Sequence, residues 1–488
     1  MVRDSYLNLN GPWSYAITTS ANKPAQADGT ILVPFSPESE LSGVGHVLQP
    51  EEYLWYIRTV TLPDGFNVGR VLLHFGAVDQ TATVWCNGVE LATHTGGYLP
   101  FTVDITEVLA KENTILVCVR DATNKSQLPR GKQTLHPHGI WYTPQSGIWQ
   151  TVWLESVPQN YIRSLRVTPL FDAHQVEITV EGEGQCMIDL EGKRFTFPAA
   201  CRRTCRCSRF ALVAGAPDAL PLQRDARGRH GLQLLCHAQV QRRDGQGRRA
   251  PPVSQRQTVF SQRPARPGYW PDGLYTAPSD DALVYDIQLA KDMGFNMLRK
   301  HVKVECDRWY YHCDRLGMLV WQDMPCGGRR YDPLIVSTPL VTGWHLDDSW
   351  YPLFGRTNVT ARKAFLNELR DMVTTLYNHP CIAVWVPFNE GWGQFDSQTA
   401  VQVIRSVDKT RTIDPASGWH DQASAMCAAC TCTSRSTNSS PTSSAAPRCC
   451  QNSAATPLRR GPRHGRQERR LQDVRRAALA RIRTAGAL

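Results

Sequence analysis

One short segment places a glutamate, a residue that often serves in acid–base catalysis, directly after a predicted buried strand. The apolar run from 382 to 386 predicts a buried strand, which leads into Asn389, Glu390 and Gly391. A carboxylic acid at the end of a strand can protonate a leaving oxygen and later accept a proton from water. A polar loop that only caps a core strand would have the same sequence pattern. The elements around this segment therefore have to distinguish a catalytic glutamate from a structural one.

These elements begin at Gly268, where predicted strands start to alternate with predicted helices. Such alternation is typical of parallel βα units, as in a (β/α)8 barrel, whose catalytic side chains stand at the C-terminal ends of the strands. Glu390 would then face a substrate. The strands are expected at 295–298, 318–321 and 382–386, and the helices at 281–293, 308–316, 361–377 and 399–407.

Cleavage of a glycosidic bond is the chemistry that fits Glu390 best, because it needs a carboxylic acid beside the leaving oxygen. The Asn389 amide can bind a sugar 2-OH, a contact that strengthens in the transition state. Trp385 and Trp392 flank the motif and offer flat apolar faces to a sugar ring.

Upstream, residues 5 to 157 alternate apolar and polar residues in short runs, which predicts an antiparallel jelly-roll or sandwich. Asn87-Gly88 between two such runs predicts a tight hairpin turn. A second, smaller sandwich is expected to begin at 158, with strands at 162–167, 176–180 and 187–190.

Two segments break this order. Residues 199–267 contain 14 Arg and no Lys, residues 423–488 contain 12 Arg and no Lys, and neither holds a sustained period. Each is either a disordered basic segment or a stretch translated in the wrong reading frame, and we favour the second interpretation. The net charge of +10 comes from them alone, since 28 basic and 39 acidic residues lie elsewhere. They lack interleaved aromatic residues, so we expect no nucleic-acid binding.

Composition sets further expectations. Cys427 and Cys430 form a single CxxC without a second pair at zinc-finger spacing, so we expect no metal and no cofactor. The chain starts without a basic region followed by an apolar run, and no stretch of about 18 apolar residues occurs. We therefore expect a cytoplasmic protein that does not bind membranes, and the sequence leaves its oligomeric state open.

Several motifs together resemble glycoside hydrolase family 2, the group of β-galactosidases, β-glucuronidases and β-mannosidases. Asn389-Glu390 matches the acid/base motif of that family. The other matching stretches are 9–13 (LNGPW), 33–35 (VPF), 55–56 (WY), 96–98 (GGY), 146–154 (SGIWQTVWL), 268–273 (GYWPDG), 294–301 (GFNMLRKH) and 317–325 (GMLVWQDMP).

The resemblance implies a multidomain chain. We expect a sugar-binding jelly-roll at 1–157, an immunoglobulin-like β-sandwich at 158–267 that is disordered or frame-disrupted from about 199, and a C-terminally incomplete TIM barrel at 268–422. Residues 423–488 would form a non-homologous, disordered basic tail.

The resemblance also assigns roles to the site. Glu390 would be the catalytic acid/base. The substrate, a β-linked glycoside or oligosaccharide, would contact Asn389, Arg299, His301, Asp323, Trp321, Trp392 and Trp419. Trp419 would end the fifth barrel strand. The alternatives are a core histidine at His301, packing or ion pairing at Trp321 and Asp323, and a core aromatic residue at Trp419.

One departure from the family matters for function. A retaining mechanism needs a second carboxylate as nucleophile, about 5–5.5 Å from the first. After Glu390 the only glutamate is Glu468, which follows no predicted strand. We therefore expect a retaining, β-galactosidase-like glycosidase that hydrolyses O-glycosyl bonds in carbohydrate metabolism but is inactive in this form. A non-catalytic carbohydrate-binding protein is the alternative.

Overall fold

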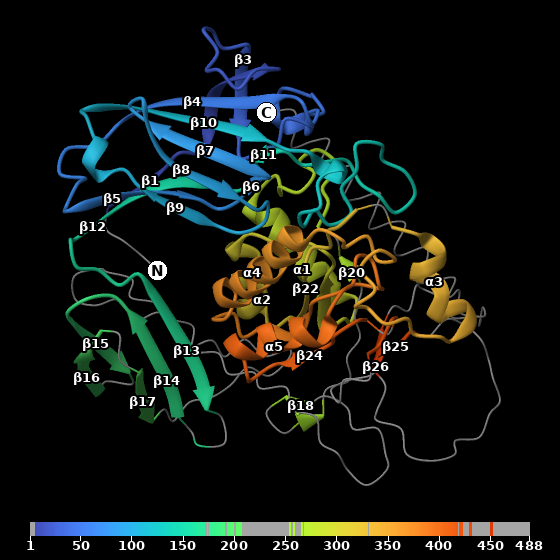
Figure 1. Cartoon of the computed structure of the whole chain (residues 1–488). Helices are drawn as coiled ribbons and strands as arrows, with labels where there is room; N and C mark the ends of the chain where they lie inside the picture. The colour runs from blue at the N-terminus through green and yellow to red at the C-terminus, as the bar shows by residue number, and fades with distance from the viewer. Residues whose placement is uncertain are drawn as a thin grey trace. The chain divides into compact units, whose positions relative to one another are not determined.

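The computed structural model describes residues 5–170, 173, 175–190, 193–199, 202–206, 253–254, 257–258, 265–266, 268–329, 331–417, 419–422, 429–431 and 449–451 (Figure 1). The chain divides into two compact units, and the elements below, apart from β25 and β26, belong to the unit formed by Met1–Cys430 and Ser444–Cys449. None of the helices in the described ranges has the length and apolar character needed to cross a membrane. Within the expected tail 423–488 the described residues form only the strands β25 (Ala429–Thr431) and β26 (Cys449–Gln451), and the rest of that segment lies outside the described part.

The N-terminal part is a jelly-roll of two antiparallel sheets, with strand orders β3-β2-β4-β10-β7-β8 and β1-β12-β5-β9 (Figure 1). Alternation along the strands builds the core between the sheets, since Ala82, Val84 and Cys86 of β7 are fully buried while the residues between them are half-buried. The strands are β1 (Ser5–Asn8), β2 (Gly11–Thr18), β3 (Gly29–Val33), β4 (Tyr53–Thr61), β5 (Arg70–Phe75), β7 (Thr81–Cys86), β8 (Val89–Thr95), β9 (Phe101–Asp104), β10 (Glu112–Arg120) and β12 (Val152–Val157), with the short pair β6 (Val78–Asp79) and β11 (Gly147–Ile148).

The predicted hairpin turn is confirmed. Asn87 and Gly88 connect β7 to β8, and both have positive φ, 51° and 83°. These residue types adopt that conformation at little cost, which is why they are favoured in two-residue hairpin loops.

A second β-sandwich follows. Strands β13 (Ser164–Leu170), β14 (Gln175–Glu181) and β17 (Arg202–Arg206) form one sheet, and β15 (Gln185–Leu190) pairs with β16 (Lys193–Pro198). Val176, Ile178 and Val180 on one face of β14 supply its small core. Strand β17 lies where the sequence predicted no regular element. Apart from β18 (Val253–Ser254), β19 (Gln257–Thr258) and β20 (Ala265–Arg266), residues 207–267 lie outside the described part.

The barrel part is an incomplete TIM barrel with five parallel strands among the described residues, in the order β20-β21-β22-β23-β24. The predicted alternation is confirmed, and an additional helix, α3, follows β22. The elements are α1 (Asp280–Asp292), β21 (Met297–Lys300), α2 (Asp307–Leu316), β22 (Leu319–Asp323), α3 (Pro333–Thr342), α4 (Val359–Thr375), β23 (Ile382–Val386), α5 (Ser397–Val407) and β24 (Thr412–Ile413).

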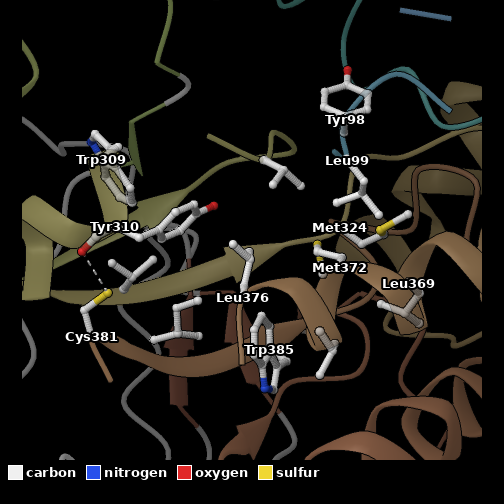
Figure 2. Close-up of a cluster of buried hydrophobic side chains, with 14 of the residues drawn as sticks. Tyr98, Leu99, Trp309, Tyr310, Met324, Leu369, Met372, Leu376, Cys381 and Trp385 are labelled. Atoms are coloured by element: carbon white, nitrogen blue, oxygen red, sulfur yellow. Dashed lines mark hydrogen bonds between the residues drawn. The ribbon is translucent and has the colours of Figure 1, made fainter. Parts of the chain in front are cut away.

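The barrel core continues into loops of the jelly-roll. Tyr98 and Leu99 lie in the same buried cluster as Met324, Met372 and Trp385 (Figure 2). The indole of Trp149, also buried, donates to Gly97 O at 2.8 Å. A shared core fixes the jelly-roll loops relative to the C-terminal ends of the barrel strands, since close-packed interiors resist small displacements.

A partly buried ion pair joins α2 to the segment before β23. His379 Nδ1 lies 2.8 Å from Asp314 Oδ2, and Asp314 Oδ1 accepts from Cys381 N at 2.8 Å. Burial by itself lowers the pKa of His379, but the hydrogen bond and charge of Asp314 outweigh it and hold the pKa above its usual value of 6.5. The pair joins two elements of the barrel core, and its strength depends on pH.

We therefore expect the stabilisation from this pair to be complete below pH 6.5 and to disappear as the pH rises through the raised pKa of His379. Denaturant unfolding as a function of pH measures this. The His379→Gln variant should lack this component of the decline, whereas His136→Gln, at an exposed position, should retain it. Equal pH dependence of His379→Gln and the unchanged protein would contradict this account.

Candidate active site

Strand periodicity brings two predicted site residues onto one face. Met297, Leu319 and Trp321 form a buried cluster between the strands with Val384 and Val386. Arg299 lies two residues after Met297, and Asp323 two residues after Trp321, so both side chains point to the same inner side. Both are buried, with 1% and 0% of their surfaces exposed. The inner face thus changes from apolar to charged at the C-terminal strand ends.

A tight loop after β23 presents the predicted acid/base. Glu390, Gly391 and Gly393 have positive φ of 54°, 74° and 65°, and Trp392 N donates to Asn389 O at 3.0 Å. A side chain on Gly391 would approach His420 Cδ2 to 3.0 Å, so both this tight contact and the positive φ favour glycine there. Left-handed backbone at a non-glycine residue is costly and recurs at functional sites. Glu390 stays partly exposed, whereas Asn389 is buried.

Arg299 connects the polar groups of the site. Its Nε donates to Asp323 Oδ1 and Oδ2 at 2.9 and 3.1 Å, and its Nη2 donates to Asn389 Oδ1 and to Ser417 Oγ, each at 2.8 Å. Because the guanidinium holds Asn389 Oδ1, the amide orientation is fixed. Asn389 Nδ2 is buried and has no hydrogen-bond partner among the described residues. It is a donor available to a ligand.

The charges of the site act on one another. Burial alone raises the pKa of Asp323, but the charges of Arg299 and His301 and the hydrogen bonds from Arg299 hold it below its usual value. Burial alone lowers the pKa of Arg299, yet Asp323, Asp414 and Glu390 keep it above the ordinary value. His301 Nδ1 lies 3.3 Å from Asp323 Oδ2, and burial lowers the pKa of His301. Asp323 is therefore held as a carboxylate between two basic groups.

An aromatic group stands beside Glu390. Trp392 meets Trp141 edge to face at 5.4 Å between ring centroids and Tyr331 at 5.5 Å, while Trp141 stacks on Tyr331 at 5.8 Å. Trp141 comes from a jelly-roll loop and Tyr331 from the segment after β22. Trp392 Nε1 has no hydrogen-bond partner within the described ranges. Aromatic faces beside a carboxylate suit a sugar ring.

Two expectations about aromatic residues need correction. Trp385 is fully buried and faces the helices, where its Nε1 donates to Asp408 Oδ2 at 2.8 Å, so it offers no face to a ligand. Val384 and Val386 occupy the inner face instead, because neighbouring strand residues point in opposite directions. Trp419 does not end the fifth strand: β24 stops at Ile413, and Trp419 lies partly exposed in the following loop. Trp321 packs in the inner cluster.

Lys132 and Trp141 were not predicted from the sequence. Both belong to a jelly-roll loop that reaches the barrel, where the backbone amides of Arg130 and Gly131 donate to Cys326 O at 2.8 and 2.9 Å. Lys132 is 8% exposed. Burial lowers its pKa below the usual value, although the negative charges of Glu390 and Asp323 act in the opposite direction. The only signal in the sequence was the Trp141-Tyr142 pair within a long loop. Three or more His, Cys, Asp or Glu residues nowhere gather as a metal site in the described part of the chain.

Comparison with protein families gives two matches to one family. Residues 44–158 match the sugar-binding domain of family 2 glycosyl hydrolases, and residues 276–446 match the TIM-barrel domain of the same family. A β-galactosidase from Thermoanaerobacter pseudethanolicus is 22% identical over 450 residues, which is 83% of this chain and 54% of that protein. Human β-glucuronidase is 28% identical over 162 residues, or 28% of this chain and 25% of that protein. The chain thus spans about half the length of these relatives or less.

Solved structures agree on the fold. A β-glucuronidase from Ruminococcus gnavus aligns with a TM-score of 0.64 at 17% identity, over 85% of this chain and 73% of that one. The β-D-glucuronidase of Dictyoglomus thermophilum aligns with a TM-score of 0.63 at 16% identity and the same coverage. Two domain models of one family match this chain, the sugar-binding domain first and the TIM-barrel domain after it. The chain therefore belongs to glycoside hydrolase family 2.

Proposed function

We propose that Glu390 is the acid/base of a β-glycosidase site and that Asn389, Arg299, His301, Asp323, Trp321, Trp392 and Trp419 form the substrate side of that site. One observation supports this most: Arg299 fixes Asn389 through its Oδ1, leaving a buried amide donor beside the partly exposed Glu390. In glycosidases a donor to the sugar 2-OH next to the acid/base stabilises the oxocarbenium-like transition state.

The relatives suggest the substrate class. Their names are β-glucuronidase and β-galactosidase, so β-glucuronides and β-galactosides are the first substrates to test. We propose β-linked glycosides in general, with the β-galactoside as one member. Trp392 together with Trp141 and Tyr331 would contact the apolar side of the sugar ring or its aglycone.

We further propose that the chain carries the acid/base without the nucleophile. Within the printed sequence the only glutamate after Glu390 is Glu468, which lies outside the described residues. Asp323 is occupied by Arg299 and His301, which makes it a poor substitute. An external anion should then replace the missing carboxylate. With an aryl β-glycoside as substrate, azide would attack the anomeric carbon from the α face while Glu390 protonates the departing oxygen. The products would be an α-glycosyl azide and the free phenol.

The test is the hydrolysis of aryl β-glucuronides and β-galactosides by the full chain, with and without sodium azide. We expect turnover that depends on azide, with the α-glycosyl azide identified by NMR. Efficient hydrolysis with retention in buffer alone would show that the chain has its own nucleophile and would contradict this part. The absence of both turnover and glycoside binding would overturn the glycosidase proposal itself. Glycoside binding without turnover, even with azide, would instead favour a non-catalytic carbohydrate-binding protein.

A further inference from the structure

Two arginines near the Glu390 loop are almost completely buried. Arg130, from the jelly-roll loop, is 4% exposed, and Arg356, from the segment between α3 and α4, is 1% exposed. Neither has a carboxylate oxygen within ion-pair distance among the residues that the structure describes. Burial lowers the pKa of Arg356 to about 10, so this side chain still carries its charge at neutral pH. Buried cations without an opposite charge are costly and uncommon.

The two side chains meet at the segment that follows β22. Arg130 Nη1 donates to Gly328 O at 2.6 Å, and a Cβ atom on Gly328 would lie 3.0 Å from Arg356 Nε. The Tyr331 ring centroid lies 5.4 Å from Arg130 Cζ. A Cβ atom on Gly393 would lie 3.0 Å from Tyr331 Cε1 and 3.1 Å from Arg356 Nη2. Both guanidinium groups therefore lie against Gly328 and beside the Tyr331 ring.

Part of the hydrogen-bonding capacity of these guanidinium groups is unused. Arg356 Nε donates to Gly393 O at 2.6 Å, but Arg356 Nη1 and Nη2 are buried and have no hydrogen-bond partner in the described ranges. The same holds for Arg130 Nε. Buried polar groups are nearly always hydrogen-bonded, so unpaired donors on two adjacent cations indicate a binding site for an acceptor. The N–H groups of a guanidinium lie in one plane at fixed angles, which suits an acceptor bound at its edge.

Aromatic rings balance only part of the charge. The Cζ atom of Arg356 lies 4.9 Å from the ring centroids of both Phe365 and Phe395. Such contacts attract the guanidinium to the ring faces but offer no lone pair to its N–H groups. The rings therefore favour a cation at this position and leave its unpaired donors for another partner.

The ionisable side chains that surround the two arginines in the described part of the chain do not supply a negative charge. Burial raises the pKa of the Cys326 thiol and of the Tyr331 hydroxyl, so both groups are neutral and donate to backbone carbonyls. Burial also raises the pKa of Asp121, which accepts from Ser146 Oγ at 2.9 Å and forms no ion pair with Arg130. A partner of opposite charge would have to come from solution.

We infer that Arg130 and Arg356 bind a small monovalent anion of the halide class, with chloride as the ligand in solution. The Nη groups of Arg356 would hold it at the guanidinium edge, and Arg130 would add a second positive charge and its Nε donor. Doubly charged oxyanions such as sulfate lose far more hydration energy on burial, so they are disfavoured at this depth. Since Gly393 belongs to the Glu390 loop and accepts from Arg356, the anion would connect that loop to the jelly-roll loop. The site does not depend on the proposed glycosidase activity.

Urea unfolding of the full chain in sodium chloride and in sodium gluconate, at equal ionic strength, tests this site. Gluconate is too large to enter a halide site, so the comparison separates binding from general screening by salt. An anion that binds only the folded chain raises the free energy of unfolding with the logarithm of its concentration above the Kd. We expect a rise of about 1.4 kcal/mol for each tenfold increase in chloride, and no comparable rise in gluconate.

Arg356→Met should abolish the chloride dependence, whereas Arg329→Met, at an exposed position after β22, should retain it. Crystals of the unchanged chain in sodium bromide give a second test that needs no variant to fold, because bromide scatters anomalously. We expect an anomalous peak in contact with Arg356 Nη1 or Nη2. Equal stability in chloride and gluconate, a chloride dependence that persists in Arg356→Met, or a bromide map without this peak would overturn the inference. None of these results would affect the glycosidase proposal.

Discussion

Glu390→Gln is expected to abolish azide-dependent turnover of phenyl β-glycosides while largely sparing that of 2,4-dinitrophenyl β-glycosides. Phenolate is a poor leaving group and needs a proton, whereas 2,4-dinitrophenolate leaves without one. Loss of a general acid typically costs about 10²–10⁴-fold in rate. The measurement is kcat/KM for both substrates with a fixed azide concentration, for the unchanged chain and for the variant.

The control for this prediction is Glu107→Gln, at an exposed jelly-roll position. It removes the same charge from the surface and should leave both rates unchanged. Equal loss on both substrates after Glu390→Gln would indicate damage to binding or folding. No loss on either would reject the assignment of Glu390 as the acid.

Arg299→Met is expected to produce the largest loss of stability in the site. Removing this buried side chain leaves Asp323 as a buried carboxylate and Asn389 Oδ1 without its donor. Breaking one side of a buried ion pair typically costs about 3–5 kcal/mol in the free energy of unfolding. Urea unfolding followed by circular dichroism measures the change. Glycoside binding should weaken as well, because the Asn389 amide is no longer oriented.

The matched control is Arg308→Met, which breaks an exposed Arg–Asp pair with Asp280, where the two side chains are 68% and 37% exposed. Exposed pairs contribute about 0–1 kcal/mol, so this variant should unfold almost like the unchanged chain. The double change Arg299→Met and Asp323→Leu should recover much of the loss, because an apolar pair replaces both buried charges. Similar losses for Arg299→Met and Arg308→Met would contradict the account.

The sequence was sufficient to predict the strand that carries Asn389 and Glu390, whereas Arg299 and Asp323 were assigned to the site through the family resemblance. Each of these residues follows an apolar strand, and parallel strands end on one edge. The direction of Trp385 could not be predicted in the same way. It lies within the continuous apolar run 382–386, where no alternation reveals which residues face inward.

Other parts had no local signal at all. Lys132 and Trp141 reach the site from a loop about 250 residues before Glu390, so only the tertiary fold brings them there. Strand β17 is five residues long within an Arg-rich stretch, too short and too polar for periodicity to stand out. The individual ion pairs and hydrogen bonds of Arg299 could not be predicted from the sequence. Residue spacing indicates which side chains lie near one another, but not which oxygen atom accepts from each donor.

A crystal structure of the Glu390→Gln chain with a bound β-glycoside tests directly whether Glu390 and Asn389 contact the bond that is cleaved. We expect the side chain at position 390 within hydrogen-bond distance of the glycosidic oxygen, roughly 2.6–3.2 Å, and Asn389 Nδ2 at a similar distance from the sugar 2-OH. A sugar bound away from these two residues, or a side chain at 390 turned from the anomeric centre, would contradict it.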